Sequence, residues 1–153
     1  MTAPVRPDPV FSIDAPRGAQ CAALPLRETP GGPLVLLVTS RDTGRWVLPK
    51  GWLEPELTGA EAAAKEAYEE AGLTGRVDPA PIGTYRYAKR LPQDRTTPCT
   101  VQVHLMHVER ELEAWPERGQ RRRRWFGLAE AAMLVEEPGL RALLRRLAPK
   151  VAA

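Results

Sequence analysis

The pattern of apolar and polar positions predicts a chain of several strands with one well-defined helix near its middle. The clearest strand is residues 34–39, an unbroken run of leucine, valine and threonine whose length suits a buried strand. Polar or Gly- and Pro-rich segments at 28–33, 40–45 and 92–98 predict turns. Weaker apolar stretches predict further strands at residues 20–26, 46–48, 82–91, 100–108 and 123–126.

The central helix is predicted at residues 60–71, which are dense in the strong helix formers alanine and glutamate. Thr58 precedes it and Glu61 follows three positions later, which is the capping-box pattern, and Gly72 stands where a helix commonly ends. An irregular loop over residues 50–59 leads into this helix. Two shorter helices are predicted at residues 128–134 and 139–147, the second amphipathic, with Arg141, Arg145 and Arg146 on a solvent-facing side.

The length of 153 residues fits one domain, which is large enough to bury roughly 70% of the surface of its unfolded chain. Residues 1–16 contain four prolines and predict a flexible or extended arm before a domain at 17–149. No apolar run approaches the ~20 residues of a membrane helix, so we expect a cytoplasmic protein without a membrane partner. Cys21 and Cys99 are expected to be reduced and buried.

The net charge is only +3, but the positive charge is almost all arginine, which suits bidentate binding of phosphate. One basic group is Arg86, Lys89 and Arg90, and another is the run 121–124. That run suggests nucleic-acid binding, but strand alternation would turn two of its side chains inward and two outward. Trp125 and Phe126 beside it are expected to pack in the core, so nucleic acid is not favoured as a partner.

Three glutamates in the central helix are the strongest candidates for chemistry. Glu66, Glu69 and Glu70 stand at i, i+3 and i+4, so their carboxylates share one face of the helix. Three like charges on one face repel each other unless a cation lies in front of them, and Mg²⁺ prefers carboxylate oxygens. The triad alone is equally compatible with a metal site and with a solvated acidic helix face.

The segment from Gly51 to Leu73 resembles the Nudix box, G-x5-E-x7-R-E-U-x-E-E-x-G-U, where U is a bulky aliphatic residue. Leu57 stands in place of the first glutamate of that pattern, Lys65 in place of the arginine, and Ala67 in place of the first aliphatic residue. In the family that glutamate and arginine brace the loop against the helix. An ion pair of Lys65 with Glu54 or Glu56 would remake the brace. Without gaps, the segment supplies Gly51, Glu66, Glu69, Glu70, Gly72 and Leu73.

The resemblance extends to the order of segments around the box. In this order the chain is similar to the diphosphoinositol polyphosphate phosphohydrolase branch, whose members also cleave diadenosine polyphosphates. It implies an α/β fold, a Nudix-type α/β/α sandwich with a mixed β-sheet, and hydrolysis of a phosphoanhydride bond by water. It implies Mg²⁺, with Mn²⁺ as a substitute, bound by Glu66, Glu69, Glu70 and a carbonyl at Gly51. Glu69 and Glu70 are both candidates for the general base, and a carboxylate outside the box is a further alternative.

A phosphate-rich substrate requires cationic and polar side chains around the metal site. Trp52, in the Gly-rich loop, could stack on a base or cover the site. Nucleoside triphosphates, nucleotide sugars, RNA 5′ ends and a non-catalytic binding module remain alternatives, and the oligomeric state is open. The candidate substrate-binding residues are Arg17, Ser40, Arg41, Arg45, Lys50, Arg86, Lys89 and Arg90.

Overall fold

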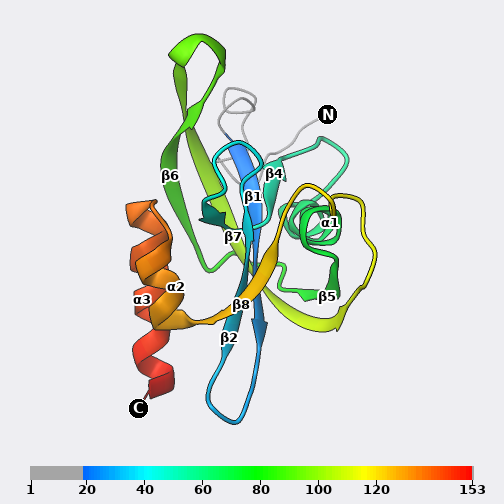
Figure 1. Ribbon diagram of the computed structural model, residues 1–153, viewed down its shortest axis with the longest axis vertical. Coiled ribbons are helices and arrows are strands. Elements are labelled where there is room, and N and C mark those ends of the chain that lie inside the picture. Colours follow the sequence, from blue (N-terminus) through cyan, green and yellow to red (C-terminus); the bar gives the residue numbers. More distant parts are fainter. Residues whose placement is uncertain (1–18, 153) are drawn as a thin grey trace.

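The computed structural model describes residues 19–152, with side chains described up to residue 148 (Figure 1). The predicted arm at 1–16 and the candidate Arg17 lie outside the described residues, so both stay predictions. No helix in the described part of the chain is long and apolar enough to cross a membrane.

Eight strands of the described chain form one sheet, in which β1 and β7 run parallel and all other paired strands run antiparallel. The central order is β3-β2-β1-β7-β5, with β4 paired to β1, β6 to β7 and β8 to β2. The mixed sheet is therefore as predicted. The strands are β1 (Ala19–Arg27), β2 (Leu34–Thr39), β3 (Trp46–Val47), β4 (Lys50–Trp52), β5 (Leu73–Val77), β6 (Gly83–Arg90), β7 (Thr96–Glu111) and β8 (Arg123–Gly127).

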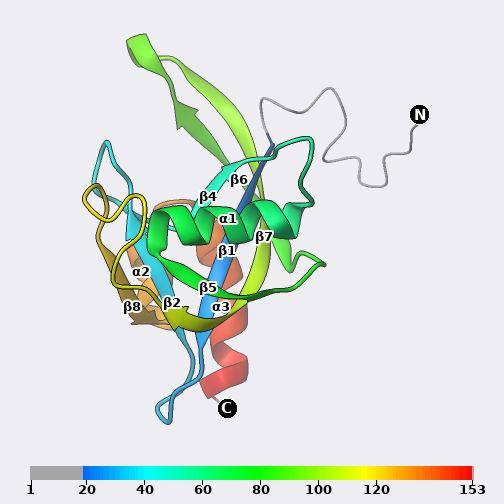
Figure 2. The same ribbon diagram turned by 90° about the vertical axis from the view of Figure 1, so that its right-hand side faces the viewer.

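Helices cover both faces of the sheet, as Figures 1 and 2 show. Helix α1 (Gly59–Ala71) lies on one face, and α2 (Leu128–Leu134) and α3 (Pro138–Ala152) lie on the other. Successive residues of β1 and β2 point to opposite faces, so Leu36 joins the core cluster under α1 and Leu37 joins the cluster under α2 and α3. The predicted α/β/α sandwich is confirmed.

Helix α1 forms where its capping signals predict. The Thr58 hydroxyl accepts a hydrogen bond from the Glu61 backbone N–H, and the Glu61 carboxylate accepts one from the Thr58 N–H. Gly72 ends the helix in the left-handed conformation at φ 68°. The buried face is almost all alanine, so the helix backbone lies close to the sheet and carries its glutamates with it. The cap alone contributes about 1 kcal/mol.

Three strands differ from the sequence prediction. Strand β4 forms within the stretch 50–59 that was predicted to be an irregular loop, because its backbone pairs with β1. Strand β7 is longer than the predicted 100–108, and β5 was missed because its sequence, LTGRV, has no apolar periodicity. Pairing with β7 holds β5 in place, and the register shifts between Thr74 and Gly75. A Cβ at Gly75 would lie 2.2 Å from the His107 carbonyl oxygen, so this close approach requires glycine.

The solvent-facing role predicted for Arg141 is wrong. Its guanidinium donates hydrogen bonds to the carbonyl oxygens of Ala132 at 3.2 Å and Val135 at 2.9 Å. These carbonyls belong to the C-terminal end of α2, where backbone acceptors have no intrahelical partner. Arg141 therefore joins α3 to α2, whereas Arg145 is exposed as predicted.

Candidate active site

A cleft of about 1140 Å³ opens where the turn at 40–45, β4, α1, β6 and the turn between α2 and α3 meet. Glu69 is not among its lining residues. Acidic side chains of α1 and basic side chains of β6 and the 40–45 turn thus face one shared space. Of the residues predicted from the sequence, the cleft brings together Ser40, Arg41, Arg45, Lys50, Gly51, Glu66, Glu70, Arg86, Lys89 and Arg90.

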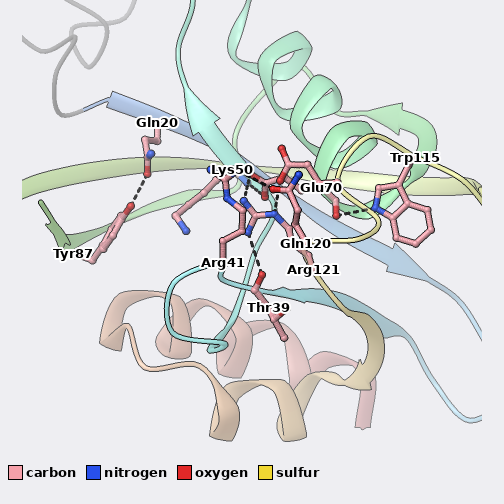
Figure 3. Close-up of polar contacts among 10 residues, drawn as sticks. Gln20, Thr39, Arg41, Lys50, Glu70, Tyr87, Trp115, Gln120 and Arg121 are labelled. Atoms are coloured by element: carbon pink, nitrogen blue, oxygen red, sulfur yellow. Dashed lines mark hydrogen bonds and ion pairs between the residues drawn. The ribbon is translucent and has the colours of Figure 1, made fainter. Parts of the chain in front are cut away.

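Glu70 is a buried acidic residue of the cleft (Figure 3). Its Oε1 accepts a hydrogen bond from the Lys50 backbone N–H at 3.2 Å, and its Oε2 lies 3.3 Å from Nη2 of Arg121. Burial raises the pKa of Glu70 to about 7, although Arg121 acts in the opposite direction. A carboxyl with this pKa can hold or release a proton near neutral pH.

Arg121 is fixed by three acceptors. Its Nε donates to Glu117 Oε1 at 2.6 Å, its Nη1 donates to the Thr39 carbonyl oxygen at 3.1 Å, and its Nη2 reaches Glu70. The guanidinium is almost wholly buried, so the pair with Glu70 is screened little by water. Arg121 is a site residue that was not predicted from the sequence, although the inward alternation of the run 121–124 was the signal for it.

The rest of that arginine run also follows the predicted alternation. Arg123 points inward, donating to the carbonyl oxygens of Ala71 at 2.8 Å and Leu112 at 2.7 Å, and its guanidinium lies 3.9 Å from the centre of the Trp115 ring. Arg122 and Arg124 are exposed. Arg123 therefore supports the C-terminal end of α1. Phe126 is buried in the core cluster under α2 and α3, as predicted.

Glu66 lies directly against the backbone of β4. A Cβ atom at Gly51 would stand 2.3 Å from the Glu66 carboxyl carbon, so only glycine leaves room for this carboxylate. Burial, and then repulsion from Glu69, raises the pKa of Glu66. This part of the cleft therefore carries crowded negative charge that a cation would relieve.

The donor set fits a hard divalent cation in its chemistry. Carboxylate oxygens on one helical face and the cradle at Gly51 are the groups that Mg²⁺ accepts. Within residues 19–148, however, no three acidic, histidine or cysteine side chains are gathered around one point. The Glu70 carboxylate lies beside that of Glu66 and also pairs with Arg121.

The basic side chains of the cleft differ in how exposed they are to solvent. Arg86 and Arg90 are exposed, whereas Lys50 is half-buried. Burial lowers the pKa of Lys50, and the charges of Glu137 and Glu70 oppose that shift. Lys50 Nζ stands 5.2 Å from the centre of the Tyr87 ring.

Two further cations already have protein partners. Arg41 donates to Gln120 Oε1 at 3.0 Å, and Arg45 lies 3.5 Å from Glu136 Oε1. Ser40 accepts a hydrogen bond from the Arg45 backbone N–H at 3.1 Å, which shapes the turn. Trp52 lines the cleft and is 39% exposed, with Lys89 Nζ 5.9 Å from its ring centre.

The brace expected at Lys65 is present. Its ammonium forms an ion pair with Glu54, which is one of the two partners predicted for it. Leu57, which replaces the usual first glutamate, packs against the core cluster under α1 instead. The loop before α1 is thus held by a different charge pair and by an apolar contact.

Comparison with protein families identifies the chain. The model of the NUDIX domain matches residues 17–147. The chain belongs to the NUDIX family. The glutamates and Gly51 described above lie within the matched region, and the family resemblance predicted from the sequence is confirmed.

Two curated relatives and one solved structure are similar to the Nudix domain described here. "Nudix hydrolase 16, mitochondrial" of Arabidopsis thaliana is 34% identical over 70% of this chain and 61% of its own length. Human diphosphoinositol polyphosphate phosphohydrolase 3-alpha is 30% identical over 76% of this chain and 68% of its own length. A C. elegans Ap4A hydrolase structure shares the fold, with TM-score 0.65, 19% identity and coverage of 85% of this chain and 94% of its own.

This chain spans between about half and two thirds of the length of its curated plant relatives, for example 61% of Nudix hydrolase 16 and 51% of Nudix hydrolase 12. The Nudix fold is shared across the domain.

Proposed function

We propose that the chain is a Mg²⁺-dependent Nudix hydrolase that cleaves a phosphoanhydride bond in a phosphate-rich small molecule. Dinucleoside polyphosphates and diphosphoinositol polyphosphates are the candidate substrates. The observation that carries the proposal is the cleft itself, in which Glu66 and Glu70 of α1 face the cations of β6 and the 40–45 turn. The names of the human and Arabidopsis relatives support it.

Glu66, Glu69, Glu70 and the backbone at Gly51 are the groups that would hold Mg²⁺. When bound, the ion would act as a Lewis acid on phosphate oxygen and lower the pKa of a nearby water. Glu70, whose pKa is raised to about 7 in the metal-free protein, is a candidate to accept a proton from the attacking water. Glu69 remains the alternative base.

The basic side chains would bind the phosphates on either side of the scissile bond. Arg86, Lys89 and Arg90 come from one strand and Lys50 from another, so a chain of phosphates can contact cations along the cleft. Such contacts orient the reacting phosphorus and offset the charge that develops during hydrolysis.

We propose a cytoplasmic location as well, on the sequence alone.

A substrate panel tests this function. The full chain is incubated with Mg²⁺ and diadenosine tetraphosphate, diphosphoinositol pentakisphosphate, nucleoside triphosphates and nucleotide sugars, and released phosphate and nucleotides are measured. We expect turnover of a polyphosphate that stops with EDTA and falls about 100-fold or more in Glu70→Gln. Glu130→Gln makes the same charge change on an exposed part of α2 and should act as wild type.

Two other outcomes of the substrate panel would contradict parts of the proposed function. Activity confined to nucleoside triphosphates would overturn the polyphosphate preference. No turnover of any compound, together with a Mg²⁺-induced rise in melting temperature, would replace the hydrolase with a metal-dependent binding module.

A further inference from the structure

Glu137, at the turn between α2 and α3, is a buried acidic residue that the proposed chemistry does not use. Its side chain lines the cleft opposite α1 and is only 3% exposed. Neither of its carboxylate oxygens has a hydrogen-bond partner among the described residues. Arg45 Nη1 approaches Oε2 only to 3.8 Å, which is an ion-pair distance and too long for a hydrogen bond.

A second unpartnered polar group lies beside it. The hydroxyl of Tyr85, on β6, is buried and has no hydrogen-bond partner among the described residues. Tyr85 packs against the start of α3, since a Cβ at Gly139 would stand 2.6 Å from the Tyr85 Cβ. Burial and then the charge of Glu137 raise the pKa of Tyr85 well above its ordinary value, so the hydroxyl keeps its proton.

Buried polar atoms without partners are costly, and a protein keeps them chiefly where something else supplies the missing hydrogen bonds. Glu137 is one of the residues that line the cleft, but its two oxygens are covered in this structure, so a bound ligand can supply the missing bonds only if the side chain turns toward the cleft. The charge of Glu137 already has two cationic neighbours, Arg45 and Lys50. Tyr85 is a neutral donor beside Glu137, but its hydroxyl makes no hydrogen bond to the carboxylate. The missing element is therefore a neutral donor that reaches the two oxygens of Glu137.

The chemistry of phosphate-rich molecules narrows the choice of donor, on the basis of the function proposed above. A phosphate group offers oxygen acceptors and negative charge, so Glu137 would repel it. Free hydroxyls donate, and two neighbouring hydroxyls can pair with the two oxygens of one carboxylate. An acidic side chain binding ribose hydroxyls is a known solution in nucleotide-binding folds. An inositol ring with a phosphate on every carbon has no hydroxyl to offer.

We propose that Glu137, with Tyr85 beside it, forms a subsite for the vicinal hydroxyls of a ribose, so that the cleft selects nucleoside polyphosphates over fully phosphorylated inositols. The phosphates would then extend from this subsite toward Lys50 and β6. Specificity would arise from a pair of buried acceptors that stay unsatisfied when the hydroxyls are missing.

Binding to compounds without any phosphoanhydride tests the subsite separately from hydrolysis. With Mg²⁺ present, calorimetry on the full chain compares adenosine 5′-monophosphate, its 2′,3′-dideoxy form and inositol hexakisphosphate. We expect the ribose compound to bind at least about tenfold more tightly than the dideoxy compound. In Glu137→Gln that ratio should shrink to within about threefold, and inositol hexakisphosphate should bind several-fold more tightly because repulsion is gone.

Glu130→Gln, an exposed position on α2, is the matched control and should keep the wild-type ratio. Equal binding of the ribose and dideoxy compounds to the wild type would overturn the subsite, and this comparison requires no variant. An unchanged ratio in a folded Glu137→Gln protein would overturn the role of Glu137. Ribose-dependent binding without any hydrolysis in the substrate panel would keep the subsite and overturn the hydrolase instead.

Discussion

The guanidinium of Arg121 lies 3.3 Å from the carboxylate of Glu70, and both side chains are more than 90% buried. Glu70 is one of the residues proposed to bind Mg²⁺, so in this structure a fixed protein cation occupies its carboxylate. Thr39 and Glu117 hold the same guanidinium from other sides. A metal ion that binds Glu70 must therefore share the carboxylate with Arg121 or replace it.

Replacement of Arg121 by alanine should lower stability in EDTA and increase the response to Mg²⁺. Loss of one partner leaves Glu70 buried and uncompensated, at a cost of about 3 kcal/mol, which is the low end for such pairs because Glu70 can take up a proton. That corresponds to a fall of about 6–12 °C in melting temperature. Thermal shift with EDTA and with Mg²⁺ measures both effects.

Arg121→Lys keeps a positive charge near the site and is the control for this variant. Its response to Mg²⁺ should lie closer to that of the wild type. A Mg²⁺-induced rise in melting temperature equal in Arg121→Ala and wild type would show that Arg121 and the metal do not act on the same carboxylate.

The stability of the metal-free protein should depend on pH through Glu70. Burial raises the pKa of Glu70 from 4.5 to about 7, so the folded state keeps this proton at pH values where the unfolded chain has released it. The contribution of Glu70 is therefore most favourable below pH 4.5 and is lost as pH rises to about 7. Urea unfolding in EDTA at a series of pH values measures this.

The comparison with Glu70→Gln isolates this carboxyl from the other titrating groups. The difference in unfolding free energy between wild type and Glu70→Gln should turn against the wild type as pH rises from 4.5 to 7. A difference that stays constant across that range would contradict the raised pKa.

Elements set by local signals were predictable from the sequence, and those set by tertiary pairing were not. Helix α1 begins at a capping residue, Thr58, and ends at a C-cap glycine, Gly72. Strand β2 is an apolar run with turn segments on both sides. Strand β5 carries no such signal, because β7 supplies its hydrogen bonds across a register shift at Gly75. Its existence depends on a partner far along the chain.

The same distinction applies to the site. Glu66, Glu70 and Gly51 lie within one short stretch, so their spacing revealed them before the fold was known. Arg121 and Glu137 reach the cleft from distant segments, and only the packing of β8, α2 and α3 brings them there. In the sequence, Glu137 is one of two adjacent glutamates before a proline, with nothing to separate it from a surface turn.

The ion pair between Lys65 and Glu54 should contribute modestly to the position of the loop before α1. Lys65→Glu places like charges together, so melting temperature should fall slightly. Metal-dependent activity should fall more clearly, because the loop continues from β4, which carries Gly51. The double variant Glu54→Lys with Lys65→Glu restores the pair with reversed charges and should recover most of both. Unchanged stability and activity in Lys65→Glu would exclude a bracing role for Lys65.

Replacement of Gly51 by alanine should reduce metal-dependent hydrolysis while leaving the fold intact. The new Cβ would stand 2.3 Å from the Glu66 carboxyl carbon. Glu66 is the end of a flexible side chain, so it can swing aside at small cost to stability, and we expect the melting temperature to change by less than about 4 °C. The displaced carboxylate can no longer meet the proposed metal position, and activity should fall about 100-fold at limiting Mg²⁺.

Gly119→Ala is the matched control, because a Cβ at Gly119 meets no atom within 4 Å. It should keep both the wild-type stability and the wild-type dependence on Mg²⁺. Part of the lost activity in Gly51→Ala should return at high Mg²⁺, since mass action offsets a weakened site. Full activity of Gly51→Ala at limiting Mg²⁺ would show that the contact between Gly51 and Glu66 has no part in binding the metal, and a collapse of its melting temperature would show that the contact supports the fold instead.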